Sequence, residues 1–222
     1  MTGSAEGPRL VGAMEDLRTV LVLLVAAYIL TTASRLGSVQ WVVTGLYVAA
    51  LAVTFRAAHP SGRRWRILGG WALVAVLAAA VALATLAPSD AEGVIDMLVA
   101  VTLMVTLVAL LRRVLSDREV TRETLAGALS AYLLLGMTFA ALYGVAAWLQ
   151  GAALFAQTDA VDTRTLQYFS FVTLTTTGYG DLSPATSTAR GLATMEALVG
   201  QAFLATLVAR LVATFRSPAA RD

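Results

Sequence analysis

Long apolar segments recur along this chain, and they constrain its fold more than any other feature. A helix of about 20 apolar residues crosses the roughly 30 Å hydrocarbon core of a bilayer. Only 14% of the residues are charged, against about 25% in a typical soluble domain, so polar groups cannot cover a globular surface. The apolar segments long enough to span are 17–33, 39–55, 67–87, 94–111, 124–150 and 189–215. The sequence therefore predicts an all-α membrane protein with six transmembrane helices.

The charges of the connecting loops predict how these helices are oriented. Four arginines follow the second segment and four follow the fourth, whereas PSDAEGVID after the third is purely acidic. With both termini in the cytoplasm, 13 of the 16 arginines lie inside, as the positive-inside rule favours. We therefore expect a multi-pass protein of the plasma (inner) membrane with cytoplasmic N- and C-termini. A signal peptide ending near TTAS is an alternative for the first segment, but Glu15 and Asp16 ahead of it argue against this.

A short polar stretch, TTTGYGD at 175–181, precedes the last apolar segment. It follows an amphipathic piece, 163–174, that is too short to cross the membrane. Irregular backbone at membrane depth is tolerated only where it is buried in protein or lines an aqueous cavity. The two glycines permit positive φ, so successive carbonyls can turn to one side, and carbonyls aimed at a common axis can replace the hydration shell of a cation. Because one chain supplies only one wall, this mechanism predicts a symmetric ring of identical subunits.

Residues 176–181 match the T-x-G-Y-G-D signature of tetrameric potassium channels. Over residues 124–215 the chain resembles the pore module of bacterial six-span members of this superfamily. The resemblance implies an ion channel that conducts K⁺ passively, without enzymatic activity and with no cofactor beyond the permeant ion. It also implies a homotetrameric pore built from an outer helix at 124–150, a pore helix at 163–174, a selectivity filter at 176–180 and an inner helix at 189–215.

The same resemblance assigns the filter residues. The ligands of K⁺ would be the carbonyl oxygens of four consecutive residues and the hydroxyl of the first: Thr176, Thr177, Gly178 and Tyr179. Gly180 would form the outer mouth. Thr177 departs from the family pattern, in which valine or isoleucine is commoner at this position. Only its carbonyl need face the ion, so we expect selectivity to survive this difference.

Asp181, Tyr168 and Glu196 are expected to support the filter, and Asp162 is expected to cap the pore helix. Asp162 is a plausible N-cap, since its carboxylate can accept from the free amides of the first turn. Asp181 is expected behind or just above the filter, bonded to the pore helix. Tyr168 lies where relatives carry an aromatic cuff, and either a hydrogen bond to Asp181 or plain aromatic packing would explain it.

Glu196 is the only acidic residue well inside a predicted span. Ionisable groups at that depth are costly and usually mark an ion path or a specific partner. Glu196 would either line the cavity and concentrate cations, or lie behind the filter, bonded to threonines such as Thr173 or Thr175. We favour the second placement, with Gln201 as a further member of the network.

Glycines mark two places on the pore helices. Gly200 matches a position that serves the family as a gating hinge, and a close helix–helix contact would explain it equally well. Gly136, Ala140 and Gly144 form a small face on the outer helix, which we expect to pack against the inner helix.

The four-helix domain at 17–111 lacks voltage-sensing arginines, because segment 94–111 contains no Arg or Lys. Since voltage sensing needs several charges crossing the field, we expect no strong intrinsic voltage dependence. The N-terminus at 1–16 and the tail at 216–222 are too short to fold alone. Regulation by a cytoplasmic ligand would therefore require an unidentified regulatory subunit or the linker at 112–123, which we expect to be a solvated connector.

Two other functions fit the sequence less well. A weakly selective cation channel would share the fold, but the intact Gly-Tyr-Gly argues against it. A transporter subunit should show repeated halves with paired broken helices, which this chain lacks. We expect membrane lipid and identical subunits as partners, and no nucleic acid.

Overall fold

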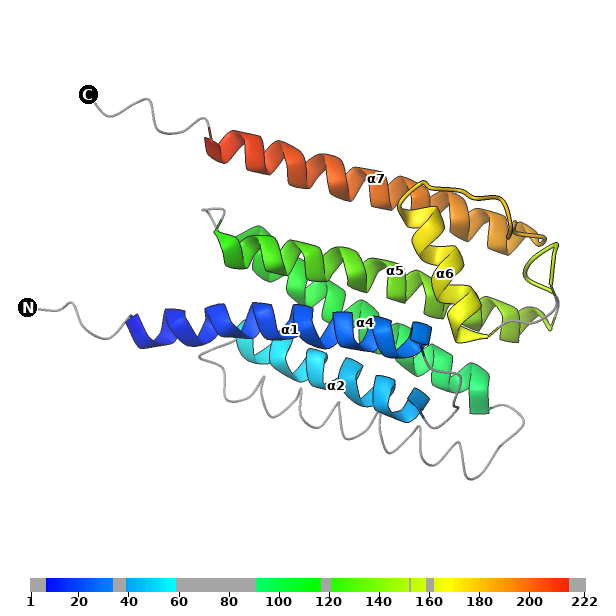
Figure 1. Ribbon diagram of the computed structural model, residues 1–222, viewed down its shortest axis with the longest axis horizontal. Helices are drawn as coiled ribbons and strands as arrows, with labels where there is room; N and C mark the ends of the chain where they lie inside the picture. Colours follow the sequence, from blue (N-terminus) through cyan, green and yellow to red (C-terminus); the bar gives the residue numbers. More distant parts are fainter. Residues whose placement is uncertain are drawn as a thin grey trace, which may run out of the picture.

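The computed structural model describes residues 7–33, 39–58, 91–116, 121–151, 153–158 and 162–215. These residues form the helices α1 (Gly7–Ala33), α2 (Val39–Ala58), α4 (Ala91–Ser116), α5 (Arg122–Gln150), α6 (Thr163–Leu174) and α7 (Ser187–Phe215). Apart from one isolated β-bridge between Phe155 and Pro184, every regular element in this part of the chain is a helix. The long helices lie roughly side by side, and the short α6 lies across one end of the bundle (Figure 1). The predicted all-α fold is confirmed.

Four helices are long and apolar enough to cross a membrane, at Asp16–Ala33, Gly93–Leu115, Arg122–Gln150 and Ser187–Ala213. α2 contributes a shorter apolar stretch, Val42–Thr54. The predicted segment 67–87 lies outside the described residues, as do the arginines at 63, 64 and 66 and the tail at 216–222. The described part of the chain is thus that of a multi-pass membrane protein.

The helices extend beyond the predicted spans at several ends. α1 begins at Gly7, inside the segment expected to be a short N-terminal arm. α4 continues to Ser116, which shortens the predicted linker at 112–123. α5 begins after Thr121, whose side chain forms a capping box with Thr124 and thereby satisfies the free amides of the first turn.

α5 is the central helix, since it contacts α1, α4, α6 and α7. Its side chains Leu134, Met137 and Tyr143 are almost completely buried. Because lipid tails are as apolar as these side chains, such helices associate mainly through close van der Waals packing and hydrogen bonds between helices. The helices α1, α2 and α4 and the helices α6 and α7 therefore share one core along α5.

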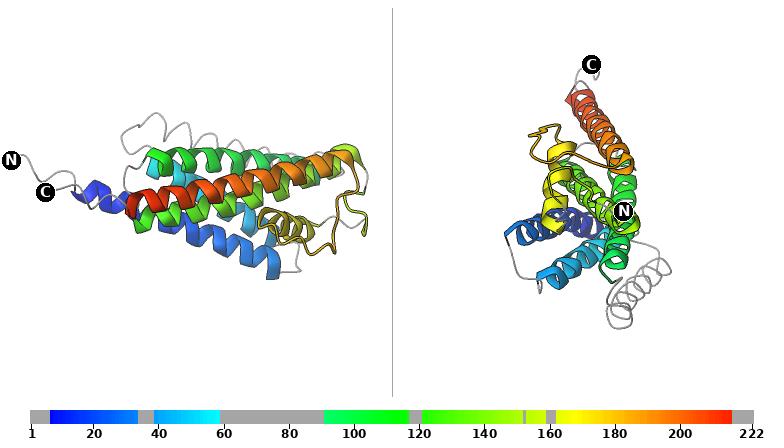
Figure 2. Two further views of the ribbon diagram at one scale, coloured as in Figure 1. Left: turned by 90° about the horizontal axis from the view of Figure 1, so that it is seen from above. Right: turned by 90° about the vertical axis from the view of Figure 1, so that its right-hand side faces the viewer.

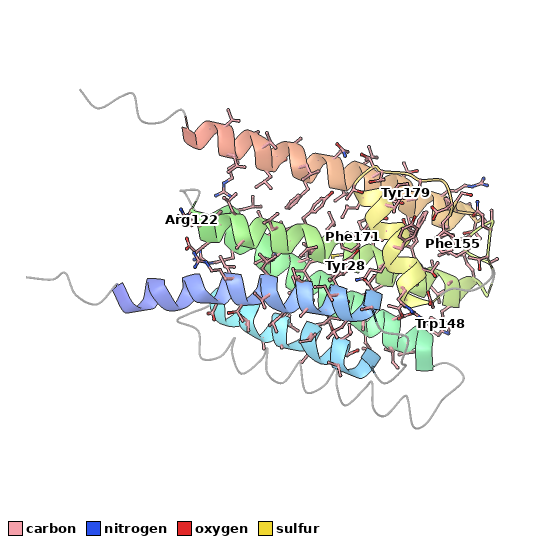
Figure 3. All side chains as sticks on the ribbon, in the orientation of Figure 1. Tyr28, Arg122, Trp148, Phe155, Phe171 and Tyr179 are labelled. Atoms are coloured by element: carbon pink, nitrogen blue, oxygen red, sulfur yellow. The ribbon has the colours of Figure 1, made fainter. Side chains whose placement is uncertain are left out.

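The small face of α5 does not pack against α7, so that prediction was wrong. A Cβ added to Gly136 would lie 2.8 Å from the ring of Phe171 on α6, and one added to Gly144 would lie 2.5 Å from Asp96 Oδ2 on α4. The Phe171 ring in turn meets Tyr28 of α1 edge-on, at a centroid distance of 5.0 Å, and Figure 3 labels both side chains. The small residues thus allow α6 and α4 to pack closely against α5. α6 occupies the place at which α7 was expected.

Two polar contacts tie the ends of the long helices together. Arg18 of α1 forms an ion pair with Glu123 of α5, with 2.9 Å between Nη2 and Oε1. Arg210, near the end of α7, donates from Nη1 to the carbonyl oxygen of Val114 in the last turns of α4, at 2.6 Å.

α7 is poorly covered within a single chain and stands at the margin of the bundle (Figure 2). Its exposed apolar side chains include Met195, Leu198, Val208 and Val212, of which Leu198 is 62% exposed.

Candidate ion-conduction site

α6 begins at a side-chain cap. Asp162 Oδ1 accepts from the backbone N–H of Thr165 at 2.7 Å, which confirms the predicted N-cap. Burial raises the pKa of the Asp162 carboxyl, but the hydrogen bonds from Thr165 and the charge of Arg164 outweigh burial, so its pKa lies below the ordinary value. An anionic group at this end also complements the helix dipole. The cap therefore fixes where α6 starts.

The loop after α6 remains bonded to the last turn of that helix. The N–H of Thr176 donates to the carbonyl of Thr173 at 2.9 Å, and the N–H of Thr177 donates to that of Val172 at the same distance. These bonds satisfy carbonyls that have no partner inside the helix. The position of the loop is thus set by the position of α6.

The backbone of the loop alternates in conformation. Thr176 and Gly178 have φ of 56° and Gly180 has φ of 80°. Thr176 is the one non-glycine with positive φ among the described residues, and a β-branched residue adopts this conformation only when its surroundings impose it. A Cβ added at Gly178 or Gly180 would meet nothing within 4 Å in one subunit. Backbone conformation, and not lack of room, therefore requires these glycines.

The loop is exposed in the single chain. Residues 175–181 are all exposed, and Tyr179 exposes 72% of its surface. Figure 3 labels Tyr179 on the segment that leads from α6 to α7. The polar loop and the poorly covered α7 are thus both exposed in the single chain.

Tyr168 and Asp181 are joined directly. The Tyr168 hydroxyl donates to Asp181 Oδ2 at 2.7 Å, and Asp181 Oδ1 accepts from the N–H of Leu182 at 3.1 Å. The hydrogen-bond alternative for Tyr168 is therefore confirmed over plain aromatic packing. This bond fastens the outer end of the loop to α6, as the sequence predicted for Asp181.

Glu196 lies fully buried between α5, α6 and α7. Its Oε2 accepts from the Tyr143 hydroxyl of α5 at 2.8 Å, and its Oε1 accepts from the Ser170 hydroxyl of α6 at 2.5 Å. The predicted partners Thr173 and Thr175 were wrong, and so was the cavity-lining alternative, because the side chain has no exposed surface. The favoured placement against the pore helix is the one the structure shows.

Gly200 lies one turn beyond Glu196 and touches the end of α6. A Cβ at this position would lie 2.8 Å from the carbonyl oxygen of Leu174 and 2.7 Å from its Cδ1. The same carbonyl accepts from the Tyr132 hydroxyl of α5 at 3.2 Å. A close helix contact therefore accounts for Gly200, and its role as a hinge stays a prediction.

Gln201 does not share the Glu196 network, contrary to our expectation. Its Nε2 lies 3.5 Å from Thr176 Oγ1, at the inner end of the loop. The described residues contain no group of three or more His, Asp or Glu side chains that could hold a metal ion.

Tyr132, Tyr143 and Ser170 were not among the predicted site residues. The two tyrosines are 11 residues apart, which places them on one face of a helix with 3.6 residues per turn. Ser170 and Glu196 are the remaining polar residues of the cluster and lie on separate helices. A tyrosine pair in register on an apolar helix was the signal that could have found them.

Comparison with known proteins places this site in a family. Residues 127–217 match a family model described as an ion channel, of the type whose pore domain has two membrane helices. No curated protein matches the chain. The matched region contains nearly all of α5, α6, the loop and α7, and the family is not enzymatic. The chain is therefore a multi-pass membrane protein that carries an ion channel domain at residues 127–217, and this match supports its place in the potassium channel superfamily.

Proposed function

We propose that this protein is a potassium-selective channel that conducts K⁺ passively across the plasma membrane. The single observation that carries the proposal is the alternation of positive φ at Thr176, Gly178 and Gly180. This alternation occurs in a loop bonded to the end of one helix and followed directly by another. Such a backbone can direct consecutive carbonyls toward one axis, where they exchange for the water around the ion.

Each part of the loop has a role in this mechanism. The carbonyls of residues 176–179 and the hydroxyl of Thr176 coordinate K⁺, and Gly180 forms the outer mouth. The Tyr168–Asp181 bond holds that mouth against α6. The C-terminal end of α6 directs its partial negative charge toward the central cavity of the proposed pore, which favours a cation there.

The channel is a homotetramer in this proposal. A single chain leaves residues 175–181 and the apolar side chains of α7 exposed. Four identical copies around a common axis bury the loop and the apolar side chains of α7, and together their loops surround the ion. Six spans per subunit and cytoplasmic termini complete the proposed topology, in agreement with the arginine distribution.

The channel lacks strong voltage dependence. In α4 the arginines occur only at Arg112 and Arg113, at the end that follows the apolar stretch. Moving one elementary charge across the membrane contributes about 2.3 kcal/mol per 100 mV, so a helix without charges in its middle gains little from the field.

Reversal potentials of the purified protein in planar bilayers, with K⁺ on one side and Na⁺ on the other, test the proposal. We expect a reversal potential near that of a K⁺ electrode for the wild type and a value near zero for Gly178→Asp or Tyr179→Ala. Equal permeability in the wild type would identify a weakly selective cation channel. Fluxes that saturate as a carrier does, with no single-channel steps, would favour the transporter alternative.

A further inference from the structure

A small cavity lies where the four-helix domain meets the pore helix. It has a volume of about 50 Å³ and is lined by residues of α2, α4, α5 and α6. Its polar lining residues are Thr44, Tyr47, Asp96, Thr163 and Gln167. None of them belongs to the loop at 175–181 or to the Glu196 cluster, so the cavity is separate from the conduction site.

Gln167 is the residue of this lining that needs an explanation. Its side chain is 4% exposed, and its Oε1 is the one buried side-chain oxygen or nitrogen in the described residues without a protein hydrogen-bond partner. A buried amide oxygen left in this condition is destabilising, and nearly all such groups in native proteins bond to protein or to ordered water.

The cavity has the size and chemistry that internal water requires. One water molecule needs roughly 10–15 Å³ of such volume and two to four polar partners. A volume of about 50 Å³ can therefore hold a small cluster. Gln167 offers an amide oxygen from α6, Thr44 a hydroxyl from α2 and Asp96 a carboxyl from α4, and all three line the cavity.

We propose that this cavity is a binding site for ordered water, which donates a hydrogen bond to Gln167 Oε1 and connects the pore helix to α2 and α4. The site gives the four-helix domain a polar link to α6, next to the apolar contact of Tyr28 with Phe171. The inference does not depend on ion selectivity.

The sign of a stability change tests this proposal. Gln167→Met keeps the size of the side chain but removes the amide oxygen together with the amide nitrogen. If water bonds to that oxygen, the full-length channel in nanodiscs should unfold at a lower temperature than the wild type. If the oxygen has no partner, the apolar replacement removes a desolvation penalty and the unfolding temperature should rise, which would overturn the proposal. Gln150→Met, at an exposed position of α5, is the matched control and should change little.

A second variant separates loss of water from a poor fit of methionine. Ala140 lines the cavity, so Ala140→Val occupies the space that water would fill. In the wild-type background this change should lower the unfolding temperature, because it displaces the water and leaves Gln167 Oε1 without a hydrogen-bond partner. In the Gln167→Met background it should be neutral or stabilising. An equal effect in both backgrounds would overturn the proposal, as would a cryo-EM map of the wild type that resolves water elsewhere and shows none beside Gln167 Oε1.

Discussion

The pore module and the helices α1, α2 and α4 are all apolar, yet the pore module has a buried network of hydrogen bonds between its helices. In the pore module, side chains bond across helices: Tyr143 and Ser170 to Glu196, and Tyr132 to the Leu174 carbonyl. In α1, α2 and α4 five threonine hydroxyls bond to the carbonyl four residues earlier in their own helix, at Thr31, Thr32, Thr54, Thr102 and Thr106. The pore module has such bonds as well, at Ser130, Thr138, Thr194 and Thr206, and Thr31 also has a hydrogen bond with Tyr47 of α2.

This difference separates two ways of building in a membrane. A hydroxyl that bonds within its own helix satisfies itself and leaves neighbouring helices to pack by shape. A bond between helices fixes the rotation and height of one helix relative to the next. In the pore module the bonds to Glu196 fix α5, α6 and α7 relative to one another at one buried point, whereas the five threonine bonds within α1, α2 and α4 leave the relative rotation of those helices unaffected.

The largest expected effect comes from Glu196→Ala. It leaves the buried Tyr143 hydroxyl without its acceptor, which costs about 1–3 kcal/mol, and it removes one of the two oxygens that the Ser170 hydroxyl can reach, the other being the Gly136 carbonyl at 2.7 Å. We expect a loss of about 2–4 kcal/mol of stability, measured by thermal unfolding in nanodiscs. Glu196→Gln keeps the length and an acceptor oxygen and should cost much less. If the two variants unfold at the same temperature, the pore module is not held by this contact.

Gly200→Ala is the next test, because it probes the contact between α7 and the end of α6. A methyl group would overlap the Leu174 carbonyl, and overpacking of this kind costs about 1–3 kcal/mol. Gly191→Ala in the same helix meets nothing within 4 Å and should gain up to about 1 kcal/mol from helix propensity. Altered open probability at unchanged stability in Gly200→Ala would point to a hinge and not to a packing contact.

Tyr132→Phe should have a smaller effect. It removes one hydrogen bond to the Leu174 carbonyl, which is worth about 1 kcal/mol. Because that carbonyl ends α6, we also expect noisier K⁺ current in single-channel records. Quiet wild-type currents in this variant would mean that the bond does not contribute to the register of the pore helix.

The smallest effect is expected for Thr106→Val in α4. Its hydroxyl bonds to the Thr102 carbonyl within the same helix, so valine removes no link between helices, and the change should stay within about 0.5 kcal/mol. A loss as large as that of Tyr132→Phe in the same unfolding assay would abolish the contrast between the two regions.

Local sequence was enough to predict most of the described helices. The pore helix was predicted at 163–174 and is observed at Thr163–Leu174, because an N-cap aspartate and a polar loop delimit it. The C-terminal ends of the outer and inner helices, Gln150 and Phe215, also agree with the prediction. These boundaries depend on residues that are neighbours in the chain.

Contacts between helices could not be predicted in the same way. The partners of Glu196 depend on which faces of α5 and α6 turn toward α7, and apolar all-round helices carry little information about their rotation. For the same reason, Gly136 and Gly144 indicated a close approach without indicating which helix approaches. The 11-residue spacing of Tyr132 and Tyr143 carried the missing information about rotation.

The contact of Arg210 with Val114 has a mechanical consequence. A short hydrogen bond from the Arg210 guanidinium to the Val114 carbonyl oxygen connects the final turns of α7 and α4. An outward movement of the end of α7 must therefore either break this hydrogen bond or move α4 with it. A force applied to either helix at this end is therefore felt by the other.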